Sequence, residues 1–561
     1  MELDASQLAP HARLEGDVVV VGGGPAGIVL ALELARADLH VILLESGRGS
    51  FSAETQRLGD TVGEDPPHAS MSLTTRRQVG GASNLWAGRC VPFDPIDFVA
   101  RQVTGHASWP VTYDELWPYF ARACEWFQCG EALFDALDVP SLAERSLVPG
   151  WPGGDIGATG LERWSLPTNF RVQYHERLRA ASHVTLVTGL TCTEIVCRTD
   201  GPGVSHAIGA TLAGGRASIR ARRYVIACGG LESTRLLFAS NRVYPDGLGN
   251  HSGHLGRWYM AHVESHIARI HFATPAQETI YGYERDPDGV YVRRRFAFSP
   301  RYAVEHDLPN AALWLDNPEL ADASHRSGIL SLLYLVLASP LGRRVVSEAI
   351  RRGQLKTTAP VSSRRHVENV VRHLPSTAGL ALALGYRRFL QRGHKLPGYF
   401  VASATNTYRL VYHAEHLPNY DSHVVPTSEV DALGVPRLRT HLRFAEADIH
   451  NALRAHDHFD RYLRAHRLGG LAHLFGDHGT REAAIHDQLF GGYHQAGTTR
   501  MAARPEDGVL DANLAVHGID DLHVASSSAF VTSSQANTTF MIVVFALRLA
   551  EHLGHVLRGP A

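Results

Sequence analysis

The sequence predicts an α/β protein in which a part built on a parallel sheet is interleaved with a part built on an antiparallel sheet with helices. Three observations predict this arrangement. Residues 17–47 follow the pattern of strand, glycine-rich turn, helix and strand. Residues 222–240 repeat a strand, a Gly-Gly turn and a helix, which indicates a return to the same sheet after an insertion. Residues 260–315 and 400–445 are rich in β-forming residues with polar alternation, which is typical of a sheet that forms one wall of a pocket.

The N-terminal segment carries the most specific local pattern. Four valines, at 18–21, predict a buried parallel strand. Gly22, Gly24 and Gly27 then form a GxGxxG turn before a helical pattern over 25–37, and a second apolar strand ends at Glu45. Such glycines let the backbone turn tightly and approach a pyrophosphate at the helix N-terminus, while an acidic residue about twenty positions on accepts ribose hydroxyls. The spacing predicts a Rossmann-like dinucleotide-binding unit; the alternative is a glycine-rich turn in another kind of α/β protein.

The middle of the chain predicts the domain boundaries. Residues 183–196 read as two strands that pair in a hairpin, and residues 320–395 read as a helical, arginine-rich insertion without obvious chemistry. We expect residues 1–100, 180–260 and 495–561 to form the dinucleotide-binding domain. Residues 101–179 and 261–494 should form the second domain, which would bind the substrate.

Composition excludes several classes of protein. The net charge of −2 gives no electrostatic footprint for nucleic acid or an anionic membrane. The six cysteines include no CxxC pair, so we expect neither a metal site nor a disulfide framework, and free thiols fit a reducing compartment. The apolar stretch at 329–338 is about half the ~20 residues that a membrane-spanning helix needs. We therefore expect a cytoplasmic protein without nucleic-acid or membrane partners.

Two polar residues near the C-terminus are candidates for chemistry. His494 lies in YHQAGTTRM, and Asn537 lies in SSQANTTFM. Folded together, they could flank a substrate hydroxyl, with the imidazole as proton acceptor. The alternatives are a surface or satisfied core histidine, and an asparagine that caps a helix beginning near residue 538.

Several motifs in one order extend this pattern over nearly the whole chain. They are GGGPAG, RRQVGGASNLWAGRCVPFDPIDF at 76–98, VIACGGLESTRLL at 225–237, GNHSGHLGRWYMAH at 249–262, and HLPNYDSHVVPTSEVDALGVPRL at 416–438, followed by the C-terminal block. In these motifs the chain resembles the glucose-methanol-choline (GMC) oxidoreductases, flavoenzymes that oxidise alcohols. Within the family, the motif sequences are most similar to those of the bacterial sugar and glycoside enzymes and of pyranose oxidase.

The resemblance implies FAD as the cofactor and a set of residues that hold it. Gly22, Gly24 and Gly27 would hold the pyrophosphate, Glu45 the adenosine ribose, and the backbone of Cys192 the adenine edge. The loop that carries Gly81, Ser83, Asn84, Leu85 and Gly88 would run along the diphosphate and flavin. Leu85 stands where pyranose oxidase has the histidine that links the flavin covalently, which implies a non-covalent FAD.

The chain departs from the family pattern at two positions. Ser526 replaces the usual aspartate near the ribityl and phosphate region of the cofactor. Thr538 replaces the proline of the usual Asn-Pro-Thr, which frees a backbone N–H. Both changes leave His494 and Asn537 in place.

The resemblance also implies a reaction and a class of substrate. His494 would be the general base, Asn537 would orient the substrate oxygen, and the flavin N5 would take the hydride. Polar positions in the predicted sheet favour a polyhydroxylated small molecule, and the most specific interpretation is the 6′-hydroxyl of a paromamine-like aminoglycoside, oxidised to an aldehyde in antibiotic biosynthesis. Oxidation of a ring hydroxyl of a sugar or glycoside is the alternative, and a non-redox lyase or structural flavoprotein is an alternative of another class. The electron acceptor, oxygen or a carrier, stays open.

A cationic substrate would require carboxylates in the pocket, because a buried ammonium without a partner is costly. The candidates are Glu264, Glu284, Asp286, Asp288 and Glu415. His262 and His266 lie in a family motif and could contact substrate, whereas no role is assigned to His251, His254, His413, His416 and His423.

Overall fold

The computed structural model describes residues 1–63, 68–165, 168–345, 361–403 and 405–558, together with Arg351 and Leu355. Its centre is a parallel sheet of six strands in the order β1-β8-β4-β3-β12-β22. The strands are β1 (Glu2–Asp4), β8 (Val184–Thr188), β4 (Val41–Glu45), β3 (Val18–Val21), β12 (Arg223–Ile226) and β22 (Leu522–Val524). All five pairings are parallel, as the valine-rich strands predict.

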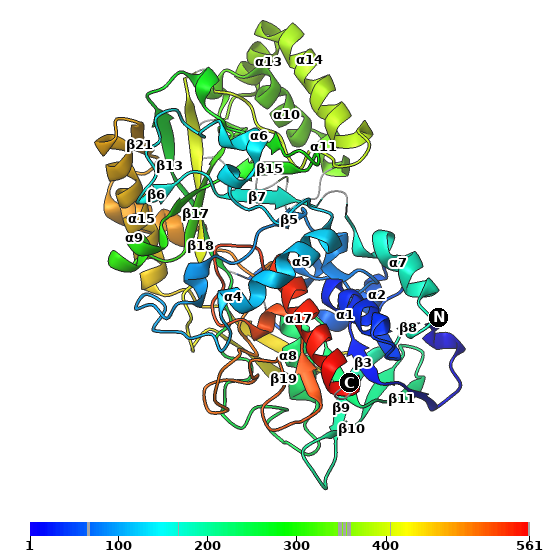
Figure 1. Cartoon of the computed structure of the whole chain (residues 1–561). Coiled ribbons are helices and arrows are strands. Elements are labelled where there is room, and N and C mark those ends of the chain that lie inside the picture. Colours follow the sequence, from blue (N-terminus) through cyan, green and yellow to red (C-terminus); the bar gives the residue numbers. More distant parts are fainter. Residues whose placement is uncertain are drawn as a thin grey trace.

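Two helices that are far apart in sequence cover this sheet together. Helix α1 (Pro25–Arg36) packs against α17 (Thr538–Arg558), so the first and last parts of the chain share one core. Figure 1 shows the two helices side by side, with both termini near this sheet. Helix α17 is long and apolar enough to cross a membrane by length and composition, but 67% of its apolar window is buried in this core. The apolar stretch at 329–338 forms a shorter apolar helix, Gly328–Ala338.

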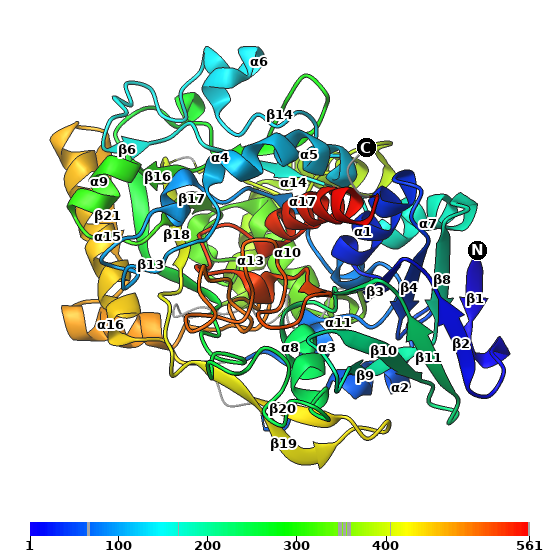
Figure 2. The ribbon, with the colours of Figure 1, turned by 60° about the horizontal axis from the view of Figure 1, so that its bottom comes forward.

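The second large sheet is antiparallel and lies at the opposite end of the molecule (Figure 2). Its order is β21-β13-β18-β17-β16-β6. The strands are β21 (Gly469–His473), β13 (His262–Phe272), β18 (Thr407–Glu415), β17 (Ala311–Asp316), β16 (Phe296–Phe298) and β6 (Ile156–Gly157). One face buries apolar residues against α15 (Glu446–Ala465), while β13 and β18 present polar residues on the other face. This confirms the predicted combination of a Rossmann-like part with an antiparallel sheet.

Three smaller sheets complete the described strands. They are β2 (Ala12–Glu15), β11 (Arg216–Arg220), β10 (Val204–Ala210) and β9 (Thr191–Cys197); β14 (Glu284–Arg285), β15 (Tyr291–Arg294), β7 (Leu161–Trp164) and β5 (Arg89–Cys90); and β19 (His423–Val430) with β20 (Pro436–His441). The predicted hairpin at 183–196 is wrong. Strand β8 pairs with β1 and β4 in the parallel sheet, whereas β9 pairs with β10 in another sheet.

The predicted insertion is helical where it is described. It contains α10 (Gly328–Ala338), α11 (Pro340–Val345), α13 (Ser363–Arg372) and α14 (Leu374–Gly385), and Figure 1 shows them gathered beyond the antiparallel sheet. Residues 346–350, 352–354 and 356–360 of this prediction lie outside the described residues. The exact domain boundaries stay a prediction.

Candidate active site

The glycine turn after β3 fits a cofactor phosphate. Gly22 has a φ of +109°, and a Cβ there would lie 2.5 Å from the Ala227 carbonyl oxygen. A Cβ on Gly27 would lie 1.8 Å from the Gly22 carbonyl oxygen, so this glycine allows α1 to pack close to the turn. Gly24 is the N-cap of α1 and has no side chain to occupy the first N–H groups of the helix. Those groups and the helix dipole make the turn suitable for an anion.

A large open cavity runs along this turn. It encloses about 1480 Å³ including its mouth, and it extends from Glu45 and Cys192 to Trp86 and Tyr493. Of the residues predicted to hold the cofactor, eight line it: Gly22, Gly24, Glu45, Gly81, Ser83, Cys192, Ser526 and Thr538. A long cavity with an anion-binding turn near one end has the character that FAD requires.

The four other predicted cofactor residues lie outside the cavity lining. Gly27 packs under the turn, and Asn84 donates from Nδ2 to the carbonyl oxygens of Val79 and Gly81, which holds the loop in shape. Leu85 is 40% exposed, and the Gly88 carbonyl accepts from the Ser165 N–H at 2.6 Å. Direct cofactor contact by these residues stays a prediction.

Glu45 forms one wall of the cavity. Its carboxylate accepts from the backbone N–H groups of Gly23 at 2.8 Å and Gly47 at 2.7 Å. Burial raises the pKa of this carboxyl group. Each oxygen keeps a second lone pair, which suits the predicted role of ribose acceptor.

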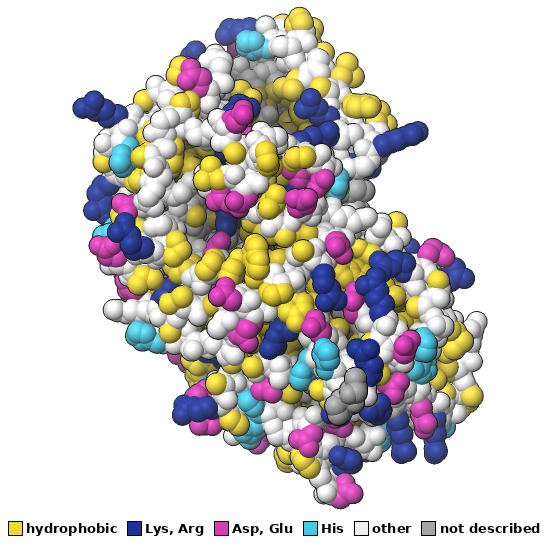
Figure 3. All heavy atoms as spheres, in the orientation of Figure 1, with side chains coloured by type: hydrophobic (Ala, Val, Ile, Leu, Met, Phe, Trp, Pro, Cys, Tyr) yellow, Lys and Arg dark blue, Asp and Glu magenta, His cyan; other side chains and the backbone are white. Residues whose placement is uncertain are grey.

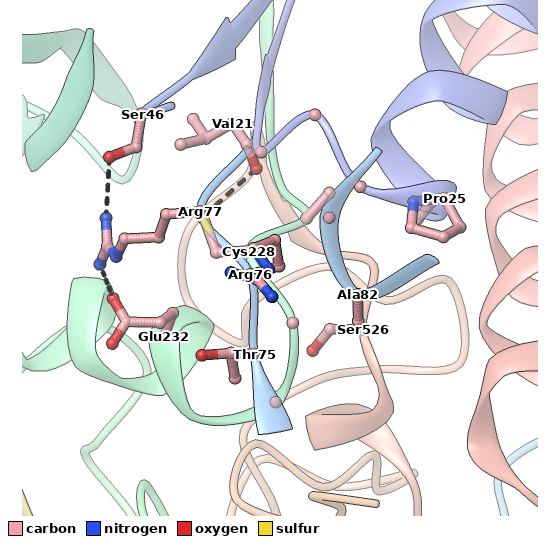
Figure 4. Close-up of a pocket in the computed structure, with 18 of the residues that line it drawn as sticks. Val21, Pro25, Ser46, Thr75, Arg76, Arg77, Ala82, Cys228, Glu232 and Ser526 are labelled. Carbon is pink, nitrogen blue, oxygen red and sulfur yellow. Dashed lines mark hydrogen bonds and ion pairs between the residues drawn. The ribbon is translucent and has the colours of Figure 1, made fainter. Parts of the chain in front are cut away.

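The sequence prediction missed charged residues of the cavity wall. Arg76, Arg77 and Glu232 line it, and Arg77 donates to the Ser46 hydroxyl at 3.0 Å and to the Glu232 carboxylate (Figure 4). Both arginines lie in the RRQVGG segment that was noted as a family motif. Nothing in that motif separates a charged residue at a cofactor from one at the surface.

His494 and Asn537 meet beside the cavity. Asn537 Nδ2 lies 2.9 Å from His494 Nε2, and their sequence neighbours Tyr493, Gln495 and Thr538 line the cavity. The two candidates for chemistry, 43 residues apart, are therefore brought together as predicted. The described hydrogen bonds of the Asn537 side chain go to His494 and Arg89, and none of them goes to a backbone N–H of α17 as a helix cap would require.

Arg89 decides how this pair is protonated, and the sequence prediction missed it. Its Nη1 donates to Asn537 Oδ1 at 2.5 Å. A guanidinium only donates, so the Asn537 amide must turn its NH₂ toward His494. His494 Nε2 must then accept, which places the proton of the neutral ring on Nδ1. The lone pair of Nε2 then points at the Asn537 amide, from which it accepts.

Burial and the charges around the pair keep His494 neutral. Burial, followed by nearby His413 and Arg89, lowers the pKa of His494 to about 3. Glu162 accepts from Arg89 at 2.6 Å and from Arg293 at 2.8 Å. Although burial opposes ionisation, Arg293 and Arg89 lower the pKa of Glu162 to about 2. This ion-pair network holds the Arg89 guanidinium in place.

Most of the candidate carboxylates are already paired. Glu415 binds Arg101 at 2.6 and 2.9 Å, Glu284 binds Arg294 at 2.7 Å, and Asp286 binds Arg163. Asp288 is exposed in a turn. Glu264 stands opposite His413 in the β13–β18 pairing, and its charge acts on His494, so it is the candidate that lies near the reactive pair.

The remaining histidines divide by position. His262 and His413 lie beside His494, with ring centroids of His262 at 4.5 Å from His413 and 4.8 Å from His494. His416 is buried between the Ala261 N–H and the Arg443 carbonyl. His266 pairs with Glu264 at 3.6 Å, while His251, His254 and His423 lie on other segments of the surface.

Comparison with known proteins gives two family matches. A model described as FAD dependent oxidoreductase matches residues 17–298, and one described as GMC oxidoreductase matches residues 418–546. Among curated relatives, 2-methyl-1,2-propanediol dehydrogenase of Mycolicibacterium austroafricanum is 25% identical over 45% of this chain and 56% of its own length. Paromamine 6′-oxidase of Streptomyces fradiae is 24% identical over 45% of this chain and 55% of its own length. The chain therefore matches little more than half the length of these relatives.

Solved structures extend the likeness of fold over the whole chain. Formate oxidase of Aspergillus oryzae RIB40 has a TM-score of 0.53 at 15% identity, and the match covers 97% of this chain and 98% of that one. Pyridoxine 4-oxidase of Mesorbium loti has a TM-score of 0.50 at 16% identity, with 96% and 98% covered. At this identity the likeness shows the fold alone. The model that matches residues 17–298, half of the chain, shows that the chain belongs to the FAD-dependent oxidoreductases, and residues 418–546 match the GMC oxidoreductase model.

Proposed function

We propose that the protein oxidises an alcohol group of a polyhydroxylated small molecule with FAD as hydride acceptor. The observation that carries the proposal is the Arg89–Asn537–His494 chain beside the cavity. It offers an unprotonated Nε2 and an amide N–H that bond to each other, and a substrate hydroxyl that replaces this bond would donate to the first and accept from the second. Retention of both groups argues against a non-redox lyase or a structural flavoprotein.

The residues of the chain divide the work of this reaction. Gly22, Gly24 and Glu45 would hold the phosphate and ribose parts of FAD, which supplies the hydride acceptor when bound. The substrate hydroxyl donates to His494 Nε2, and its oxygen accepts from Asn537 Nδ2. As the carbinol hydrogen leaves, His494 takes the hydroxyl proton, which makes its ring a cation. Asn537 holds the oxygen without competing for the proton.

FAD is proposed to bind without a covalent link. The support is Leu85, an apolar side chain at the position where the family resemblance places a linking histidine. We also propose that the protein acts in the cytoplasm and that its electron acceptor is oxygen or a carrier. Acid should release intact FAD into the supernatant; flavin that precipitates with the polypeptide would contradict the non-covalent link.

For the substrate, the charges around the pair include one carboxylate, that of Glu264, which is not shared by the two arginines. Arg89 and Arg293 stand against the carboxylates of Glu162 and Glu264, and Glu162 is already shared by the two arginines. An aminoglycoside 6′-hydroxyl remains a candidate, supported by the relative named paromamine 6′-oxidase and by Glu264 as ammonium partner. A neutral sugar or glycoside ring hydroxyl is the alternative, and it requires no such partner.

An anaerobic screen of flavin reduction tests the function. Sugars, glycosides, simple diols and aminoglycosides are mixed with the holoenzyme, and bleaching of the flavin is followed. The His494→Ala variant should still bind FAD. With an active alcohol, its flavin should be reduced roughly 10²–10⁴-fold more slowly, which is the range for loss of a general base. Asn537→Ala should have a smaller effect, because it removes an orienting hydrogen bond and leaves the proton acceptor. Reduction of the His494→Ala flavin at the parental rate would refute the assigned base.

A further inference from the structure

A second pair of histidines lies beside the proposed base without an assigned role. His262 lies on β13 and His413 on β18, and the side chains are 6% and 5% exposed. One ring nitrogen from each, and one from His494, all lie within 4.8 Å of one another. A small polar group could therefore contact two of the three rings at once.

Backbone carbonyls fix the tautomers of both rings. His262 Nδ1 lies 3.0 Å from the Ser534 carbonyl oxygen, and His413 Nδ1 lies 2.7 Å from that of Gln535. A carbonyl only accepts, so Nδ1 must carry the proton and donate in each ring. Burial, with nearby His413 and Arg89 respectively, lowers the pKa of His262 well below its usual value and that of His413 to about 4. Both rings are therefore neutral, and both Nε2 atoms present bare lone pairs.

The Nε2 of His262 is buried and has no hydrogen-bond partner among the described residues. Taken alone this means little, because His456 also has a buried Nε2 without a described partner, on the apolar face of the same sheet. His262 differs because one of its ring nitrogens lies within 4.8 Å of a ring nitrogen of His413 and one of His494. A buried acceptor left unpaired destabilises by about 1–3 kcal/mol, and a donor from a ligand would remove that penalty.

The local charge indicates which donor fits. The three rings would also suit a divalent transition metal, since two of them donate to carbonyls through the other nitrogen. However, the Arg89 guanidinium lies close enough to lower the pKa of all three, and it would repel a dication or an ammonium in the same way. A hydroxyl donates a hydrogen bond without adding charge.

We propose that His262 and His413 accept a hydrogen bond from a second hydroxyl of the substrate, on the carbon next to the one that is oxidised. The substrate class is then a 1,2-diol, of which a sugar is a polyhydroxylated case. The inference rests on the proposed function, because it places the reacting hydroxyl at His494. The second hydroxyl binds and is unchanged, while the two electrons and one hydrogen of the reacting carbinol go to FAD and its proton to His494.

The test compares 2-methyl-1,2-propanediol with 2-methyl-1-propanol. These probes share the carbon skeleton and the primary alcohol, and they differ by the neighbouring hydroxyl alone. Two quantities are measured on the holoenzyme: the second-order rate constant of anaerobic flavin reduction, and the dissociation constant by calorimetry in the slowly reacting His494→Ala variant. The diol should react at least 10²-fold faster and bind more tightly, because a site built to bond a hydroxyl rejects the analogue that lacks it.

Three variants locate the preference. In His262→Phe and His413→Phe, the diol and the monool should have nearly equal rate constants and nearly equal dissociation constants. His413→Gln keeps an acceptor near the place of Nε2 and should therefore restore part of the preference for the diol. The matched control is His456→Phe, which removes an equally buried imidazole with its own carbonyl partner and should leave that preference unchanged. If a phenylalanine variant loses FAD, the ¹⁵N signals of labelled histidines in the parent are used instead. Addition of the diol should then shift the Nε2 signals of His262 and His413.

The outcomes separate the inference from the function beneath it. The inference is overturned if the diol and the monool react and bind equally well. It is also overturned if the His262 and His413 variants keep the full preference for the diol. Tight Zn²⁺ binding that requires all three histidines would overturn it as well, because such binding would mark a metal site. If no alcohol of any class reduces the flavin, the proposed function fails. The dissociation constants of the diol and the monool, measured by calorimetry, then decide alone whether the two histidines recognise a diol.

Discussion

At the scale of single residues, the site depends on which atom of each side chain carries a proton. Arg89 can only donate, and this one property sets the Asn537 amide and through it the tautomer of His494. The sequence could predict His494 and Asn537 because they stand in recognisable motifs. It could not predict Arg89, which lies 448 residues from Asn537 and follows a glycine loop where an arginine has no local signature.

Replacement of Arg89 should therefore slow the reaction without weakening substrate binding. In Arg89→Leu the Asn537 amide is free to turn its oxygen toward His494, which then favours a proton on Nε2 and loses its basic lone pair. Loss of one charge-assisted hydrogen bond, about 1.5–3 kcal/mol, corresponds to a roughly 10–10²-fold lower rate of flavin reduction. The ¹⁵N spectrum should show His494 changing from the Nδ1–H to the Nε2–H tautomer.

The control for Arg89 is Arg293→Leu. Arg293 shares Glu162 with Arg89 but donates to the carboxylate in the described structure, with no bond to Asn537. It should disturb the ion-pair network without changing the His494 tautomer. Equal tautomer shifts in the two variants would mean that the network, and not the Arg89–Asn537 bond, positions the base.

At the scale of elements, the sequence predicted correctly the structure that depends on local contacts, and it failed where strands pair with distant parts of the chain. The strand, turn and helix at 18–36 were predictable, because the turn geometry and the periodicity are local. The hairpin at 183–196 was wrong because β8 gains two parallel neighbours, β1 and β4, which lie far away in sequence. Two adjacent strands with a short turn look the same in sequence whether they pair with each other or with distant strands.

The close packing of α1 on its turn gives a prediction at this scale. Gly27→Ala would place a Cβ 1.8 Å from the Gly22 carbonyl oxygen, so the helix must move away from the turn that holds the phosphate. We expect the purified variant to have a lower ratio of FAD to protein and a lower melting temperature. Gly379→Ala in α14 is the control, since its Cβ would meet nothing within 4 Å, and it should stabilise the helix by up to about 1 kcal/mol. Full FAD occupancy in Gly27→Ala would show that the turn tolerates the displacement.

At the scale of the whole molecule, the site lies where strands of the antiparallel sheet contact the C-terminal segment that leads into α17. Arg89, His262, His413, His494 and Asn537 come from distant parts of the chain and meet there. Long-range assembly of this kind is why the sequence could name the reactive pair but not its surroundings. On the face shown in Figure 3, positive and negative side chains are mixed, so that face offers no broad field of one sign to attract a charged substrate.

The burial of neutral histidines should make the whole protein sensitive to acid. Burial lowers the pKa of His413 and His456 to about 4 and that of His523 to about 3, against about 6.5 in an unfolded chain. Between these values the unfolded state binds more protons than the folded one, so stability must fall as pH falls from about 6.5 toward 4. Each such histidine contributes up to about 1.4 kcal/mol per pH unit to the slope.

Urea unfolding at several pH values in this window should show that slope of the free energy of unfolding against pH. His456→Phe should reduce it, whereas His486→Gln, at an exposed position, should not. A free energy of unfolding that is flat from pH 6.5 to 4.5 would mean that these imidazoles are already charged in the folded protein, and with them the neutral histidine cluster at the site.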